Sequence, residues 1–218
     1  LLPGGPGHSH QSVRDISALA GVPRLVLVEP SSEAEVQAIF DHLVNRVDES
    51  AYLRLVSVKW PLPFTYPSGQ CVDVGQGWVV REGADAVAFA YGPWLLANAF
   101  EAAQQIEEST GVGIRLVNLP WLNRVDAAWL RQVIGDRRTI VTLDNHYLHG
   151  GQGEMLGAAI AELGLTPAAR VSRVGVATLP ECGTNDEVLA HHGLDVDGLA
   201  QSLRQAVGGR QPAAGSRQ

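Results

Sequence analysis

Two loops of this sequence combine glycines with histidines, and histidine is the side chain whose unperturbed pKa lies nearest to neutrality. The first loop, residues 4–12 with the sequence GGPGHSHQS, carries His8 and His10. An imidazole in such a loop can accept a proton and return it at neutral pH, which is the chemistry of general acid–base catalysis. From the residues alone, exposure to solvent explains a histidine in a glycine-rich loop better than catalysis does.

The second loop joins a predicted strand to a predicted helix. Residues 139–144, TIVTLD, are β-branched and apolar, as in a strand buried on both faces, and Gly150 and Gly151 precede residues of helical periodicity. A helix start of this kind can bind an anion, but the glycines miss the GxGxxG spacing by one residue and no GK[ST] follows. We therefore expect these glycines to serve a tight turn and close helix packing, and we expect His146 and His149 to be solvated rather than metal ligands.

The composition excludes several classes of protein. The 218 residues are 45% hydrophobic and 18% charged, and no apolar run approaches the ~20 residues that span a bilayer. The net charge of −7 disfavours nucleic acid as a partner. Cys71 and Cys182 are too few for a disulfide scaffold or a zinc site, so we predict a soluble, cytoplasmic protein. Packing in the core or at an interface is the expected role of the five tryptophans.

Met155 is the only methionine, so we expect that Leu1 follows residues that are absent from this sequence. At the other end, residues 208–218 are rich in Gly, Pro, Ala, Ser and Gln, which predicts a disordered tail.

Residues 13–58 are predicted to form a short helix followed by a β–α–β unit. Ser12 is the expected N-cap of the short helix, and Ser32 with Glu35 makes an expected capping box for the next helix. The two strands of this unit are expected to pair in parallel through a right-handed crossover. The predicted elements are a helix at 13–19, a strand at 24–28, the capped helix, and a strand at 51–58.

The second half shows a regular alternation of strands and helices. Residues 64–83 are rich in glycine and proline, so we predict a linker there, ending in a small hairpin around Val79 and Val80. The alternation that follows predicts a doubly wound α/β domain. Its predicted strands are 86–91, 114–118, 139–144 and 169–176, and its predicted helices are 94–108, 126–134 and 196–207.

Six segments, in their order along the chain, resemble the C-terminal half of transketolase-type thiamine-diphosphate enzymes. GPGHSHQSVRDIS is similar to the histidine loop of the pyrimidine-binding domain of that family. LVLVEPSSEAEV is similar to the strand, proline and capped helix that follow that loop. The segments typical of the C-terminal domain of the family are REGADAVAFAYGP, IRLVNLPWLNRVD, IVTLDNHYLHGGQG and GTNDEVLAHHGL.

The resemblance implies an α/β fold with two parts. Residues 1–63 would be the C-terminal part of a pyrimidine-binding domain, a partial α/β unit. Residues 64–83 would be a linker, and residues 84–207 a doubly wound, mostly parallel, five-stranded transketolase C-terminal domain. The tail at 208–218 would be disordered.

The function implied by the resemblance is that of a transferase of carbohydrate metabolism, which moves a two-carbon ketol unit from a ketose donor to an aldehyde acceptor. Thiamine diphosphate, with Mg²⁺ or Ca²⁺, would be held by a separate domain with a GDG…N motif, which this chain lacks. The glutamate that activates the coenzyme in the family lies upstream of the matching region. We therefore expect a fragment or a natural split subunit, inactive alone, that joins an N-terminal transketolase subunit or domain in a homodimer or heterotetramer.

Other members of this enzyme group remain as alternatives. The chain is also compatible with the β-type subunit of a 2-oxo acid dehydrogenase, or with a deoxyxylulose phosphate synthase-like enzyme, in which case the donor is a 2-oxo acid. A non-catalytic dimerisation module is a third interpretation.

The resemblance also indicates site residues. Alignment of SHQ with the THQ or THH of the family makes His10 the catalytic histidine, whereas alignment of GPGHS with GPQHS selects His8; we favour His10 because VRDI continues in register. His8 and Arg54 are then the predicted substrate-binding residues. The phosphate-binding arginine of transketolases corresponds most closely to Ser57, so we predict a donor that is unphosphorylated or anchored differently. Cofactor-binding residues cannot be placed, and no metal ligand is predicted.

Overall fold

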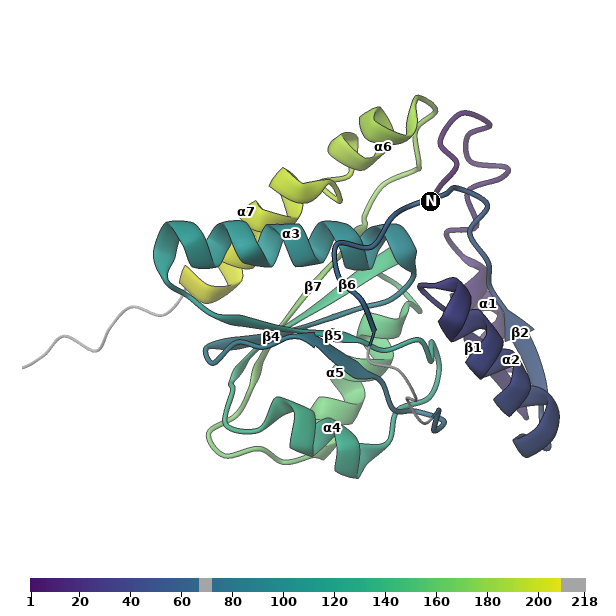
Figure 1. Cartoon of the computed structure of the whole chain (residues 1–218), viewed down its shortest axis with the longest axis horizontal. Helices are drawn as coiled ribbons and strands as arrows, with labels where there is room; N and C mark the ends of the chain where they lie inside the picture. Colours follow the sequence, from purple (N-terminus) through teal and green to yellow (C-terminus); the bar gives the residue numbers. More distant parts are fainter. Residues whose placement is uncertain (67–71, 209–218) are drawn as a thin grey trace, which may run out of the picture.

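The computed structural model describes residues 1–66 and 72–208 and contains two sheets (Figure 1). One is a two-stranded sheet near the N-terminus, and the other has five strands in the order β3-β5-β4-β6-β7. The predicted α/β fold with a mostly parallel five-stranded sheet is confirmed. Cys71, its neighbours at 67–70 and the predicted tail from residue 209 onward lie outside the described residues. Within the described ranges, no helix is both long and apolar enough to cross a membrane.

The N-terminal unit is the predicted β–α–β arrangement. Its elements are α1 (Asp15–Leu19), β1 (Leu25–Val28), α2 (Glu33–Arg46) and β2 (Ser50–Leu53), and β1 pairs with β2 in parallel. The strand predicted at 51–58 ends at Leu53 in the structure, so the second half of that prediction is wrong. Its partner β1 ends just before Pro30, which has no N–H to continue the hydrogen bonds between the two strands.

Two predicted caps differ from the structure. The N-cap of α1 is Arg14, without a side-chain cap bond, so Ser12 does not cap the helix as predicted. Ser32 accepts a hydrogen bond from the Glu35 backbone N–H at 3.2 Å, which is half of the predicted capping box. The other half is missing because the Glu35 carboxylate accepts from the Ser31 backbone N–H and hydroxyl instead, at 2.5 and 2.6 Å.

Part of the predicted linker contributes a strand to the larger sheet. The segment predicted as a hairpin around Val79 and Val80 is instead β3, which pairs antiparallel with β5 at the edge of the sheet. The four other strands are parallel. The elements of this domain are β3 (Trp78–Arg81), β4 (Ala86–Ala90), α3 (Pro93–Thr110), β5 (Ile114–Asn118), α4 (Ala127–Ile134), β6 (Thr139–Tyr147), α5 (Gln152–Glu162), β7 (Arg170–Val176), α6 (Asn185–His191) and α7 (Val196–Gly208).

The five-stranded sheet lies between two layers of helices. Figure 1 shows α3 and α7 on one face and α4 and α5 on the other. Alternate residues of β4 serve the two faces: Ala88 belongs to one core, while Val87 and Phe89 belong to the other. Val26 and Val28 of β1 join the second core, so the N-terminal unit packs against the larger domain.

The glycine junction after β6 is a close-packed turn rather than an open anion site. The Asp144 carboxylate accepts hydrogen bonds from the backbone N–H groups of Gln152 and Gly153, at 3.0 and 2.9 Å, so the chain supplies its own anion to the start of α5. A Cβ at Gly153 would lie 2.3 Å from the Thr142 hydroxyl, which explains the glycine.

The prediction that His146 is a solvated turn residue is wrong, because β6 continues to Tyr147 and buries the His146 side chain completely. Its Nδ1 lies 2.8 Å from the Tyr147 carbonyl oxygen, and its Nε2 accepts from the Ser17 backbone N–H at 3.4 Å. Burial lowers the pKa of the imidazole. His149 is exposed, as expected.

Candidate functional site

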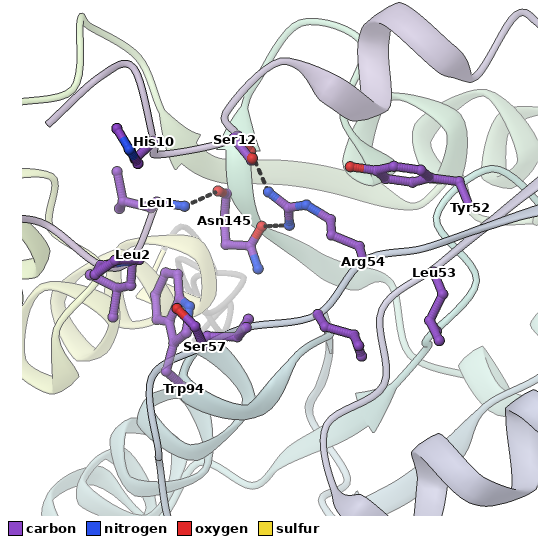
Figure 2. Close-up of a pocket in the computed structure, with 13 residues that line it drawn as sticks. Leu1, Leu2, His10, Ser12, Tyr52, Leu53, Arg54, Ser57, Trp94 and Asn145 are labelled. Carbon is purple, nitrogen blue, oxygen red and sulfur yellow. Dashed lines mark hydrogen bonds between the residues drawn. The ribbon is translucent and has the colours of Figure 1, made fainter. Parts of the chain in front are cut away.

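A cavity of about 390 Å³ lies where the N-terminal unit meets the carboxyl ends of the larger sheet (Figure 2). After β4 the chain forms β5 on one side of β4, and it then crosses over to form β6 on the other side, so the strand order reverses at β4. In doubly wound proteins, ligands bind outside the carboxyl ends of the strands at such a reversal. Trp94 follows β4 closely and Asn145 lies near the end of β6. The residues that line the cavity are Leu1, Leu2, Pro3, His10, Ser12, Tyr52, Leu53, Arg54, Leu55, Val56, Ser57, Trp94 and Asn145.

Arg54 forms the centre of a buried ionic cluster in the wall of this cavity. Its Nε donates to Asp15 at 2.8 Å, and its terminal nitrogens donate to Glu29, to the Asn145 side-chain oxygen and to the Ser12 carbonyl oxygen. Figure 2 shows the guanidinium reaching between Ser12 and Asn145. Burial opposes the charge of Arg54, but the neighbouring carboxylates outweigh burial and raise the pKa of the guanidinium above its ordinary value.

The partners of Arg54 are themselves fixed by further contacts. Glu29 is fully buried, and its second oxygen accepts from the Asn145 side-chain amide at 2.9 Å. Gly92, with φ of +70°, lies against Glu29 so closely that a Cβ would be 2.1 Å from the carboxylate oxygen. The Tyr52 hydroxyl donates to Asp15 at 3.1 Å. The cluster therefore joins α1, the end of β1 and the end of β6 into one rigid wall.

The structure brings two of the three predicted site residues to this cavity. His10 is exposed at the cavity, with its Nδ1 2.9 Å from the Ser9 hydroxyl. Arg54 lies in the cavity wall, but the groups of its own chain engage it on all three nitrogens. His8 is half-buried, does not line the cavity, and has an enclosed Nε2 without a partner among the described residues. The roles of all three residues stay predictions.

Sequence reasoning missed other residues of the site. The tryptophans, Trp94 among them, were expected only to pack, and Asn145 had no predicted role at a site, yet Trp94 and Asn145 line the cavity. Their position next to the carboxyl ends of two parallel strands is the signal that could have identified them. Glu29 and Asp15 carry no such signal, because only the folded chain brings them to Arg54.

The loop that carries His10 is held by the segment before α6 and by the first residue of α6. The Gln11 side-chain amide donates to the Glu181 carbonyl oxygen at 2.9 Å, and the Gly4 N–H donates to the Asn185 side-chain oxygen at 3.0 Å. Gly7, with φ of +73°, lies directly against the Cys182 sulfur. The position of His10 thus depends on residues of the C-terminal domain.

A second buried polar cluster lies away from the cavity. The Asn118 amide donates to Glu35 at 2.7 Å and to the Tyr66 hydroxyl at 2.9 Å, and Ser31 contacts both of these residues. Burial raises the pKa of Glu35 to about 7, and the hydrogen bonds from Ser31 and Asn118 oppose that shift. The cluster links α2 to the end of β5, so it joins the two parts of the molecule.

Comparison with known proteins gives a consistent assignment. The family model described as "Transketolase, C-terminal domain" matches residues 75–199. The 1-deoxy-D-xylulose-5-phosphate synthase of Syntrophotalea carbinolica is 30% identical over 93% of this chain, and the enzyme of the same name from Geobacillus thermodenitrificans is 29% identical over 98%. This chain covers 31% and 34% of their lengths, so it spans about a third of these relatives.

A solved structure described as "Split gene transketolase, inactive beta4 tetramer" has the same fold. It superposes with a TM-score of 0.79 at 24% identity, over 92% of this chain and 63% of the solved one. The matched family model covers more than half of the residues. The chain therefore belongs to the transketolase family, of which it contains the C-terminal domain.

Proposed function

We propose that this chain is the C-terminal part, or a separate subunit, of a thiamine-diphosphate-dependent enzyme that transfers a two-carbon ketol unit from a ketose to an aldehyde. The observation that carries the proposal is the position of His10, at a cavity that lies at the winding reversal of a transketolase-family sheet. An imidazole there can hydrogen-bond a hydroxyl or carbonyl group of the donor and exchange a proton with it.

We expect this chain to form one side of the coenzyme site rather than the whole of it. Within residues 1–66 and 72–208, no group of three or more His, Cys, Asp and Glu side chains is arranged to hold a metal ion. The diphosphate and its metal would then need ligands from a partner domain or subunit. When bound, thiamine diphosphate supplies the carbon that carries the two-carbon unit, while this chain supplies the wall that orients the donor.

The charges of the cavity favour an unphosphorylated donor. Arg54 is the only lysine or arginine among the described residues that line the cavity, and the two carboxylates of Asp15 and Glu29 already more than offset its single positive charge. A phosphate group would have to displace these carboxylates from a buried guanidinium. The side chain of Ser57, which is exposed, offers a hydroxyl but no charge.

A second candidate reaction is the decarboxylating condensation of a 2-oxo acid with an aldehyde, because the similar curated proteins are named 1-deoxy-D-xylulose-5-phosphate synthase. The two reactions differ in their products. With a GDG…N partner protein, thiamine diphosphate and Mg²⁺, ketol transfer forms a new ketose from a ketose and an aldehyde. The second candidate instead releases CO₂ from pyruvate.

His10→Gln tests the catalytic role in the same assembled enzyme. We expect a loss of about 10²-fold or more in kcat, because the variant keeps a polar side chain but cannot exchange the proton. His8→Gln, in the same loop but outside the cavity, is the matched comparison, and we expect a much smaller effect. A full rate for His10→Gln, or a larger loss for His8→Gln, would show that His10 does not have this role.

A further inference from the structure

A second cavity, of about 450 Å³, lies apart from the cavity that contains His10. It is formed by α3, α6, the turn into α7 and the segment that follows β2, and the described residues that line it all differ from those that line the first cavity. Figure 1 shows α6 and α7 on the same face of the sheet as α3. A cavity of this volume can hold a small molecule.

Four carboxylates line this second cavity, and they come from different elements. Glu101 belongs to α3 and Asp186 to α6, while Asp195 and Asp197 lie where α7 begins. The Asp195 carboxylate accepts from the Gly198 backbone N–H at 3.0 Å, whereas the other three side chains form no ion pair or hydrogen bond within the described part of the chain. No lysine or arginine among the described residues lines the cavity, so its negative charge is not offset locally.

Asn98 places a further acceptor in the same cavity. Its side chain is 5% exposed, and its Nδ2 donates to the Leu194 carbonyl oxygen at 3.0 Å. Its Oδ1 has no donor among the described residues and is not sealed from solvent, so it opens into the cavity that Asn98 lines. This oxygen can therefore accept a hydrogen bond only from a group that enters the cavity.

The second cavity also has an apolar part. Leu189, Ala190 and Val196 line it, and Trp60 contributes a half-buried aromatic side chain. The face of an indole ring attracts ammonium groups, because the π-system is negative there. The lining thus combines several acceptors of positive charge with surface that favours hydrocarbon.

A single metal ion does not fit this arrangement. Within residues 1–66 and 72–208, no group of three or more His, Cys, Asp and Glu side chains is placed to hold a metal. Divalent cations such as Ca²⁺ need several oxygen ligands around one point. A ligand whose positive charges are themselves spread along its length matches these carboxylates better.

We propose that the second cavity binds a linear aliphatic polyamine. Its ammonium groups pair with the carboxylates of Glu101, Asp186 and Asp197, and one of them donates a hydrogen bond to the Asn98 Oδ1. Its methylene groups lie against the apolar part of the lining. This site is separate from the cavity of His10 and does not rest on the proposed function.

Isothermal titration calorimetry of the full chain with spermidine tests the proposal, in about 0.15 M salt to screen the general charge of the surface. We expect saturable binding of one spermidine per chain. The double variant Glu101→Gln/Asp186→Asn removes two carboxylates of the cavity and should weaken binding roughly tenfold. Glu162→Gln/Asp136→Asn removes the same charge from exposed positions outside the cavity, and this matched control should change the affinity less than about twofold.

Nuclear magnetic resonance of the ¹⁵N-labelled full chain locates the site without any variant. We expect the cross-peaks of the Trp60 indole and of the Asn98 side-chain amide to move as spermidine saturates the chain. The indole cross-peak of Trp129 should stay in place, because Trp129 is half-buried on α4, on the opposite face of the sheet.

Three results would each overturn the proposal: no saturable binding, equal losses from the two double variants, or binding that leaves the Trp60 and Asn98 cross-peaks unmoved. A peptide with three lysines and blocked ends is the second probe, since it carries the charge of spermidine on a polar backbone. Tighter binding of the peptide than of spermidine would assign the cavity to a basic segment of a partner protein and reject the polyamine.

Discussion

Replacement of Arg54 by methionine tests the buried ionic cluster that forms the cavity wall. Arg54 is 7% exposed, and Glu29, its partner, is fully buried. Methionine approximates the length of the arginine stem but has neither its charge nor its donors. In the variant, the Glu29 carboxylate would remain in the interior with only the Asn145 amide as a partner, and Asp15 would lose its ion pair.

The expected loss of stability follows from the buried charge that the substitution leaves unpaired. Removal of one member of a buried ion pair destabilises proteins by about 3–5 kcal/mol, because the other charge stays desolvated without compensation. Arg54→Lys keeps the charge but cannot reach Asp15, Glu29, Asn145 and Ser12 at once, so we expect a smaller loss. Neutralising the remaining charge in Arg54→Met/Glu29→Gln should recover about 1–3 kcal/mol relative to the sum of the single changes.

Urea unfolding followed by circular dichroism measures these free energies, provided that the dependence on denaturant is unchanged between the variants. A loss below about 1 kcal/mol for Arg54→Met would mean that the ion pairs contribute little net stability. Strictly additive effects of the two substitutions would mean that Arg54 and Glu29 do not interact. Either result would refute the conclusion that this cluster holds the cavity wall.

Three further predictions concern other parts of the molecule. Because burial raises the pKa of Glu35 to about 7 from its usual 4.5, the unfolded chain loses this proton first, and stability should fall by about 3 kcal/mol between pH 4.5 and 7. Glu35→Gln should flatten that decline in urea titrations at several pH values, and an unchanged slope would contradict the assignment. Gly153→Ala should lower stability by about 1–3 kcal/mol through overpacking, whereas Gly157→Ala, with nothing within 4 Å of its Cβ, should raise it by about 0.5–1 kcal/mol. If both substitutions shifted the melting temperature in the same direction, overpacking at Gly153 would not be the explanation. Finally, Gln11→Ala should speed hydrogen exchange at residues 4–10, because it removes the bond to the Glu181 carbonyl oxygen; equal protection would show that the loop does not need this contact.

The regular elements of the larger domain follow from the sequence because their signals are local. The buried strand of residues 86–90 is a continuous apolar run, and the helix predicted at 94–108 is α3, which begins at Pro93 and ends at Thr110 with Gly111 as its C-cap. The edge strand β3 has no comparable signal. It is four residues long and gains its strand structure from pairing with β5, so its prediction as part of a linker hairpin failed.

The residues of the site also differ in how far the sequence alone could indicate their positions. The resemblance of the loop to the family pointed to His10 as a candidate for proton transfer, and the structure places His10 at the cavity. The same reasoning treated Arg54 as a substrate ligand without its partners, because the carboxylates that engage it lie far from it in sequence. The burial of His146 was also not predictable from the sequence, since the length of β6 depends on pairing with its neighbour β7.

By itself, the sequence determined the alternation of strands and helices, the class of fold, and the loop in which an imidazole is available. These features depend on periodicity and on the intrinsic preferences of glycine, proline and capping residues, which act over a few positions. Only the tertiary structure decided that Asp15, Glu29 and Asn145 surround Arg54, and that β6 buries His146. The reason is physical: burial and long-range pairing set the energies of charged and polar groups, and neither exists until the chain has folded.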